Sequence, residues 1–282
     1  MTRRVAASRP TAVPSRLLRL TEKEKTQLFT ATEADPPSLY GERVLDRAQG
    51  PLRHFDPFRS KLAAGLIREP RLLPPAVGER WLYLGAAGGT TVSHVADLVG
   101  PKGEVFAVEK SARPCIRLLA IAERLPGLYP LIGDARRPEE YLSLVPTVDG
   151  LYLDVSQPDQ VAIAIANHRL FLRRGGRFLF CVKLASLARS VDPDASLRSV
   201  LADLSKEFAL EPPIALAPFH RAHVLLAGRA LSPDRRRHAP PAPPVRPAGR
   251  ASVRVLPRLT RAGNRPRARG RAVPQRPPAR SR

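Results

Sequence analysis

The chain has little of what membrane-bound and exported proteins need. Its 282 residues contain no apolar run of about 18 residues, the length that a membrane-spanning helix requires. The first 20 residues, MTRRVAASRPTAVPSRLLRL, lack the continuous apolar segment of a secretory signal. Their five arginines and absence of acids are compatible with an organellar transit peptide, which no other feature favours. We therefore expect a cytoplasmic protein without a membrane anchor.

Cysteine is also scarce. The chain has two cysteines, Cys115 and Cys181, and neither has a neighbour at the spacing typical of metal ligands. A single pair in a chain of this size is typical of buried thiols in a reducing compartment. We predict no disulfide and no metal site.

Acids and lysines are few relative to arginine. The chain has 25 acidic and 47 basic residues, seven of them lysines, and a formal net charge of +22. Residues 235–282 hold 15 arginines, ten prolines and no acid, so this tail contributes +15 of that charge. Proline and like-charge repulsion predict a disordered tail over 233–282. Its arginines would contact RNA phosphates without reading sequence, and the alternative is a compositional bias without a role.

Glycines interrupt an apolar strand at one informative place. In residues 81–94, WLYLGAAGGTTVSH, a short strand leads into a glycine-rich turn and then into the start of a helix. Gly85 and Gly89 would let the backbone approach a ligand, and the helix would present free N–H groups. A second strand ends at Glu109, about 20 residues later, where an acid usually binds ribose hydroxyls. The pattern predicts a Rossmann-like cofactor site, although the nicotinamide fingerprint G-x-G-x-x-G is absent.

Strands and helices alternate after this turn. The strands are nearly continuous apolar runs, which indicates a parallel sheet covered by helices on both faces and an α/β fold. Gly175 and Gly176 are predicted to form the turn into the fifth strand. The expected strands are 105–109, 129–133, 150–155, 176–183, 209–215 and 223–228, and the expected helices are 57–68, 115–125, 160–172 and 194–208.

Several runs resemble the fibrillarin family and occur in the family's order. They are SLYGERV at 38–44, FDPFRSKLAAGL at 55–66, the run at 81–109, GDARRP at 133–138, LDVSQPDQ at 153–160 and HVLLAG at 223–228. The resemblance covers residues 38–230 and implies an S-adenosylmethionine (SAM)-dependent methyltransferase that modifies RNA ribose 2′-hydroxyls. It implies the class I methyltransferase fold, a mostly parallel seven-stranded sheet with an antiparallel last strand. Tyr83 stands where most such enzymes have an acid, and fibrillarins share this tyrosine.

The resemblance and the composition together divide the chain into four parts. Residues 1–37 are expected to be a poorly ordered extension, in which only 21–29 could form a short helix. Residues 38–56 would form a small β-rich lobe, and residues 57–232 the SAM-dependent methyltransferase domain. The basic tail at 233–282 completes the chain.

Three residues match the lysine, aspartate, lysine pattern of 2′-O-methyltransferases: Lys61, Asp154 and Lys183. The last two end strands, so they should lie at the carboxyl edge of the sheet, where ligands bind. Two of these positions are lysines in an arginine-rich chain. An arginine guanidinium could not accept the proton that a ribose hydroxyl loses on methylation. We expect Lys183 to be the general base, oriented by Asp154 and assisted by Lys61. Alternatively, the lysines reach solvent and the aspartate caps a turn.

His223 is the fourth catalytic candidate. The family usually has Tyr-Glu-Arg-Asp-His at this place, whereas this chain has Phe219-His220-Arg221-Ala222-His223. The histidine could instead be a packing residue at the start of a buried strand. The lost acids motivate a second class of function, a non-catalytic SAM-binding or RNA-binding module. Protein glutamine methylation is a third possibility.

The resemblance also implies how SAM would be bound. The two threonines after the glycines would bind the methionine carboxylate, unless Thr90 only caps the helix. Glu109 would bind the ribose, Asp134 the adenine amino group, and Gln157 would lie near the methionine end. The complete predicted set is Gly85, Ala87, Gly89, Thr90, Thr91, Glu109, Lys110, Asp134, Ala135, Asp154 and Gln157.

RNA is the expected partner, either rRNA or tRNA. One form of the hypothesis is a guide-dependent enzyme that needs a scaffold protein and a guide RNA. The other is a stand-alone enzyme that binds RNA through its own basic surface, which the arginine-rich tail favours.

Overall fold

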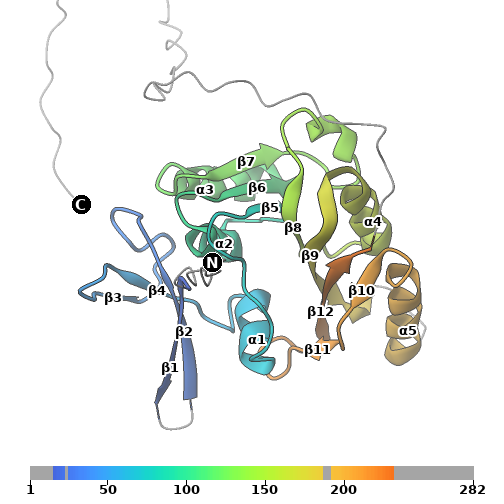
Figure 1. The fold of residues 1–282 in the computed structure, drawn as a ribbon, viewed down its shortest axis with the longest axis horizontal. Coiled ribbons are helices and arrows are strands. Elements are labelled where there is room, and N and C mark those ends of the chain that lie inside the picture. The colour runs from blue at the N-terminus through green and yellow to red at the C-terminus, as the bar shows by residue number, and fades with distance from the viewer. Residues whose placement is uncertain (1–14, 23–24, 187–191, 232–282) are drawn as a thin grey trace, which may run out of the picture. The chain divides into compact units, whose positions relative to one another are not determined.

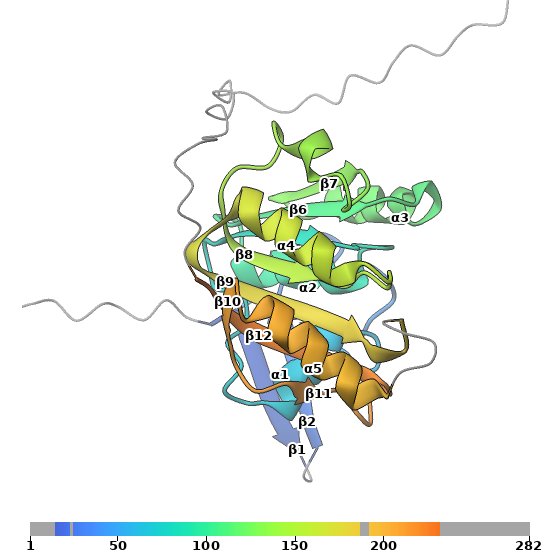
Figure 2. The same ribbon diagram turned by 90° about the vertical axis from the view of Figure 1, so that its right-hand side faces the viewer.

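The computed structural model describes residues 15–22, 25–186 and 192–231. The predicted tail at 233–282 and residues 1–14 of the predicted N-terminal extension therefore lie outside the described residues. Within the described ranges, no helix combines the length and apolarity needed to span a membrane. Figures 1 and 2 show a small N-terminal sheet and a larger sheet with helices on both of its faces.

The N-terminal lobe begins earlier than predicted. It is an antiparallel sheet in the order β1-β2-β4-β3, formed by β1 (Leu17–Glu22), β2 (Lys25–Ala31), β3 (Val44–Leu45) and β4 (Leu52–His54). The expected helix at 21–29 is wrong, because Glu22 and Lys25 face each other across a hairpin. The lobe boundary at 38 is wrong for the same reason. Leu28 and Phe29 on β2 are buried, so tertiary packing outweighs the helix-forming charged residues near the turn.

The larger sheet has the predicted α/β architecture. Its strands follow the order β10-β12-β9-β8-β5-β6-β7, and β11 pairs with β12 outside this path. Strands β5 to β9 are parallel to one another, whereas β12 is antiparallel to β9, as the resemblance implied. The strands are β5 (Arg80–Leu84), β6 (Glu104–Glu109), β7 (Leu128–Ile132), β8 (Val148–Leu153), β9 (Leu172–Lys183), β10 (Phe208–Leu210), β11 (Ile214–Ala215) and β12 (His223–Ala230).

Helices cover both faces of this sheet (Figure 2). On one face, α1 (Lys61–Arg68), α2 (Thr90–Val99) and α3 (Ala112–Ala122) pack on strand side chains such as Tyr83. On the other face, α4 (Gln160–Phe171) and α5 (Pro193–Leu204) pack on side chains such as Leu82. Because neighbouring strand residues point to opposite faces, each strand contributes to two cores, which explains the continuous apolar runs.

Three local predictions need correction. Helix α1 begins at Lys61 rather than at 57, because the Ser60 hydroxyl caps it by accepting the Ala63 N–H. Gly175 and Gly176 lie inside β9, at a register shift against β8, rather than in a turn before the strand. The strand expected at 209–215 is divided into β10 and β11, because the prolines at 212 and 213 have no N–H to donate.

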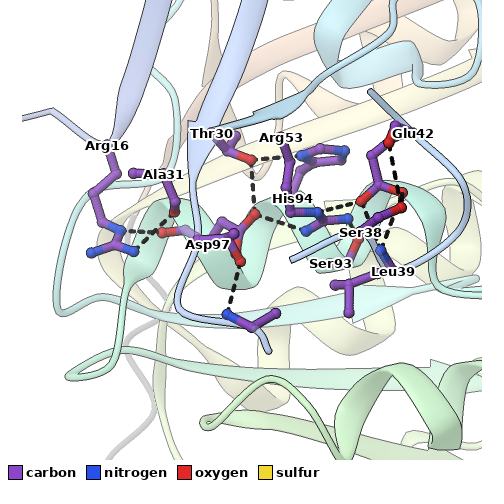
Figure 3. A network of polar contacts seen from close by, with 12 residues as sticks. Arg16, Thr30, Ala31, Ser38, Leu39, Glu42, Arg53, Ser93, His94 and Asp97 are labelled. Atoms are coloured by element: carbon purple, nitrogen blue, oxygen red, sulfur yellow. Dashed lines mark hydrogen bonds and ion pairs between the residues drawn. The ribbon is translucent and has the colours of Figure 1, made fainter. Parts of the chain in front are cut away.

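A buried guanidinium joins the N-terminal lobe to α2 (Figure 3). The Arg53 side chain is fully buried; its Nε donates to Glu42 Oε1 at 2.5 Å and its Nη1 to Asp97 Oδ2 at 2.7 Å. Its Nη2 donates to the Ser93 hydroxyl at 2.9 Å. Two carboxylates and a hydroxyl therefore satisfy a charge that would otherwise be very unfavourable inside the protein.

The same network contains a buried imidazole. His94 Nδ1 lies 2.7 Å from the Thr30 hydroxyl, and His94 Nε2 lies 2.5 Å from the Tyr40 hydroxyl. The His94 ring also stacks on Phe55, with ring centroids 4.2 Å apart. Burial and the neighbouring Arg53 lower the pKa of His94 well below 6.5. The structure therefore requires the neutral form of this histidine.

We predict that the protein loses stability as the pH falls below about 6.5. Burial lowers the pKa of four imidazoles below the ordinary value of 6.5, those of His54, His94, His168 and His220. The unfolded chain would take up protons in this range that the folded chain resists, so the free energy of unfolding should decrease. Urea unfolding at about pH 7.5 and pH 5.5 measures the change. The decrease should be smaller in His54→Asn, and equal unfolding free energies at the two pH values would contradict the prediction.

Candidate functional site

The glycine-rich turn between β5 and α2 packs against the neighbouring strand and α3. Gly85 has φ +83°, and a Cβ atom there would lie 2.5 Å from the Asp154 carbonyl oxygen. Gly89 precedes α2 with φ +90°, and a Cβ atom there would lie 2.9 Å from Ile121 Cδ1. Contacts within the protein therefore exclude a side chain at either glycine.

A pocket of about 200 Å³ lies beside this turn, at the carboxyl ends of β5, β6, β7 and β8. This is the edge at which ligands bind in open α/β sheets. Eight predicted residues line the pocket: Gly85, Ala87, Glu109, Lys110, Asp134, Ala135, Asp154 and Gln157. The lining residues that the sequence analysis missed are Val108, Ser111, Gly133, Val155, Ser156 and Ile163. Ser156 could have been found, since it lies inside the run LDVSQPDQ.

Gly89, Thr90 and Thr91 do not line this pocket. The Thr91 side chain is buried, and its hydroxyl donates to the Ser60 hydroxyl at 3.1 Å. Ser60 caps the helix that begins with Lys61. Thr91 therefore connects the start of α2 to the start of α1, and the structure gives it a positioning contact where we expected cofactor binding.

The Glu109 carboxylate connects two loops at the pocket. Its Oε2 accepts the Ala87 N–H at 2.8 Å, and its Oε1 accepts the Ser111 N–H at 2.7 Å. Ala87 has φ +46°, a left-handed conformation that is uncommon for a residue with a Cβ atom. Glu109 thus holds the pocket side of the glycine-rich turn in an unusual backbone conformation, and its oxygens face groups that donate hydrogen bonds.

Asp134 is a second carboxylate at the pocket. It forms an ion pair with Lys110 at 2.8 Å and accepts the Arg136 N–H at 3.1 Å. These hydrogen bonds lower the pKa of Asp134, with that from Lys110 the largest contribution. Asp134 is therefore an ionised acceptor, which fits the amino group of a nucleobase.

A salt bridge joins the loops after β7 and β8. The Arg136 guanidinium donates to both carboxylate oxygens of Asp159, at 2.7 and 3.0 Å, and to Gln157 Oε1 at 2.8 Å. Gln157 lines the pocket as predicted, but its amide oxygen is engaged by Arg136. The bidentate contact holds the two loops together at the pocket.

The structure brings Lys61 and Asp154 together. Lys61 Nζ donates to both carboxylate oxygens of Asp154, at 2.9 and 2.8 Å, and both side chains are largely buried. Burial opposes the charged form of Lys61, but Asp154 outweighs it and raises the pKa of Lys61. The aspartate is therefore paired with Lys61, whereas we expected it to orient Lys183.

Lys183 lies at the end of β9, the strand next to β8, and pairs in register with His223 on β12. Among the residues that the structure describes, the Lys183 ammonium has no hydrogen-bond or ion-pair partner. His223 Nδ1 lies 2.9 Å from the backbone oxygen of Arg221, so this imidazole contacts its own loop. The register places two predicted catalytic residues side by side, one of them with an unpaired amine.

His220 is a residue that the sequence analysis did not single out. Its Nε2 lies 2.9 Å from the Pro57 carbonyl oxygen, on the segment that leads into α1. Burial lowers the pKa of His220, and the nearby Lys61 lowers it further. The signal in the sequence was the histidine at a position where the family usually has glutamate. The adjacent Ala222 has φ +57°, a conformation that the family's aspartate tolerates better than alanine does.

Comparison with known proteins gives consistent matches. The family Fibrillarin matches residues 16–231. The chain is 38% identical over 208 residues to the fibrillarin-like rRNA/tRNA 2′-O-methyltransferase of Aeropyrum pernix, which covers 73% of this chain and 89% of that protein. The crystal structure of Aeropyrum pernix fibrillarin with natively bound S-adenosyl-L-methionine has a TM-score of 0.68 and 36% identity, covering 73% of this chain and 90% of that one. Fibrillarin in the fibrillarin/Nop5p complex has a TM-score of 0.69 and 36% identity, and the match covers 77% of this chain and 98% of that one.

We predict that Gly85→Ala impairs the site more than Gly78→Ala does. Both glycines have φ +83°, so each alanine should cost about 1–2 kcal/mol of stability through its backbone conformation. Only at position 85 would the new Cβ collide with Asp154, since nothing lies within 4 Å of position 78. Calorimetric titration with SAM should show weaker binding for Gly85→Ala alone. Equal SAM affinities for the two variants would show that the contact with Asp154 does not matter.

Proposed function

Because this chain belongs to the fibrillarin family, we propose that it is a SAM-dependent methyltransferase that modifies ribose 2′-hydroxyls of rRNA or tRNA. The observation that carries the proposal is the Lys61–Asp154 ion pair, which adjoins the pocket lined by Glu109 and Asp134. The unpaired amine of Lys183 lies at the end of the neighbouring strand. A cofactor site and a set of polar groups suited to proton transfer therefore share one edge of the sheet.

The residues present at the pocket fit SAM. Asp134 is an ionised acceptor for the adenine amino group, and Glu109 can accept hydrogen bonds from the two ribose hydroxyls. Gly85 leaves room where the turn meets Asp154. When bound, SAM supplies an electrophilic methyl group on its sulfonium. The protein's task is then to position the acceptor and to remove its proton.

The Lys61–Asp154 pair and Lys183 divide that task. Asp154 keeps the Lys61 ammonium in place, so the pair can hold the acceptor nucleotide through a hydroxyl or a phosphate. A ribose hydroxyl is a weak acid, so its attack on a methyl group needs a base within hydrogen-bond reach. Lys183 takes the role of that base, and His223 beside it in register is placed to orient the amine or the acceptor.

We expect Lys183→Ala to lower methyl transfer by about 100-fold or more while SAM binding is retained. Lys183→Arg should be nearly as inactive, because a guanidinium preserves the positive charge but cannot accept a proton. Transfer of labelled methyl groups to RNA measures the rate, and Lys206→Ala, an exposed lysine paired with Asp203, is the matched control. Full activity of Lys183→Arg would mean that the residue only contacts phosphate.

The finer form of the proposal is a stand-alone enzyme that acts on RNA without a guide complex. The arginine-rich composition of residues 235–282 supports it, because an enzyme without partners must supply its own phosphate contacts. The similarity to fibrillarin in the fibrillarin/Nop5p complex supports the other form, in which a scaffold protein takes part. Methyl transfer to naked RNA by the purified chain alone distinguishes the stand-alone form from the scaffold-dependent form.

We predict that removal of residues 235–282 weakens the salt dependence of methyl transfer to naked RNA. Each phosphate contact that is lost should reduce the slope of log affinity against log salt by about 0.7–0.9. The Michaelis constant for RNA, measured over a series of salt concentrations with and without the tail, gives both slopes. If the slope is unchanged, the tail does not bind RNA.

A further inference from the structure

Phe58 is the only exposed aromatic side chain among the residues that the structure describes. Its relative exposure is 65%, whereas the other described aromatic rings are buried or partly buried. Phe58 lies three residues before Lys61, on the segment that leads into α1. A single exposed apolar side chain is normal on a protein surface, so its position in the chain is what distinguishes Phe58: the helix that follows it begins with Lys61, which pairs with Asp154.

The ring is held in place rather than loosely attached. The Phe58 N–H donates to Asp56 Oδ1 at 2.8 Å, and its ring meets Phe219 edge to face with centroids 5.0 Å apart. Next to these contacts, His220 Nε2 lies 2.9 Å from the Pro57 carbonyl oxygen. The segments at 56–58 and 219–220 therefore support each other, and one face of a preorganised ring can receive a ligand at low entropic cost.

Arg59 supplies a positive charge next to Phe58 in the chain. Arg59 follows Phe58 and lies over the Tyr40 ring, 4.5 Å from its centroid. Among the described residues, no carboxylate lies within ion-pair distance of Arg59, and the Asp56 carboxylate is engaged by the Phe58 N–H. An arginine without an acidic partner that follows an exposed aromatic residue is a combination with which proteins bind single-stranded nucleic acids.

We propose that Phe58, supported by Phe219, is a stacking site for an unpaired base of the RNA next to the nucleotide that is methylated. This inference rests on the proposed function, since it assigns the substrate a second contact at the same site. A base has an aromatic face whatever its identity, so the site would fix the position of the RNA strand without selecting its sequence. Arg59 would then contact the adjoining phosphate.

Kinetics of variants test the stacking site. Stacking of one base on an aromatic side chain corresponds to about 5- to 150-fold in affinity, so Phe58→Ala should raise the KM for RNA within that range. Its kcat and its affinity for SAM should change little, and Phe58→Tyr should behave like the unchanged chain. Leu73→Ala is the matched control, because Leu73 is 60% exposed and lies near Arg177, toward the other end of β9. An unchanged KM in Phe58→Ala would overturn the inference.

Fluorescence gives a second test that does not depend on activity. The chain has a single tryptophan, Trp81, which is fully buried, so Phe58→Trp adds an exposed reporter. A short single-stranded oligoribonucleotide should quench its emission, whereas Leu73→Trp should respond much less. Quenching without methyl transfer by the unchanged chain would support the stacking site and contradict the stand-alone form of the proposed function. Methyl transfer without quenching would overturn the stacking site alone, and the absence of both would overturn the stacking site and the stand-alone form.

Discussion

The buried Arg53 guanidinium is the contact on which the arrangement of the site depends. It has no exposure to solvent, so its charge is tolerated only where Glu42, Asp97 and Ser93 surround it. Two of these three partners lie on α2, the helix that begins directly after the glycine-rich turn. Removing one partner would leave an uncompensated buried charge, so the N-terminal lobe and α2 hold each other in a single position.

A series of direct contacts connects α2 to the polar residues of the site. Thr91, in the first turn of α2, donates to Ser60, and Ser60 caps the helix that begins with Lys61. Lys61 then reaches Asp154 at the end of β8, whose carbonyl oxygen lies against Gly85. The turn that forms the pocket and the ion pair beside it are therefore connected by direct contacts, which is how a site keeps its geometry on a rigid scaffold.

Two acids that the fibrillarin resemblance implies are replaced within one loop. The family's glutamate and aspartate are replaced here by His220 and Ala222. His220 contacts the Pro57 carbonyl oxygen, and so it supports the segment that carries Phe58 and leads to Lys61. Ala222 has a left-handed backbone conformation, which an aspartate tolerates better than an alanine does. Its carbonyl oxygen accepts the Leu184 N–H. The loop therefore has no acid at these two positions, and it contacts Leu184, which follows β9, and Pro57, which precedes α1.

The sequence by itself determined the alternation of helices and strands, the glycine-rich turn and the acids Glu109 and Asp134 at the ends of their strands. These features depend on local patterns, because burial on both faces of a parallel sheet requires continuous apolar runs. Only the tertiary structure decided that residues 17–31 form a hairpin, that Thr91 binds Ser60, and that Asp154 pairs with Lys61. Lys61 and Asp154 are 93 positions apart in the chain. An ion pair over that separation follows from how strands and helices pack in space, which no local pattern contains.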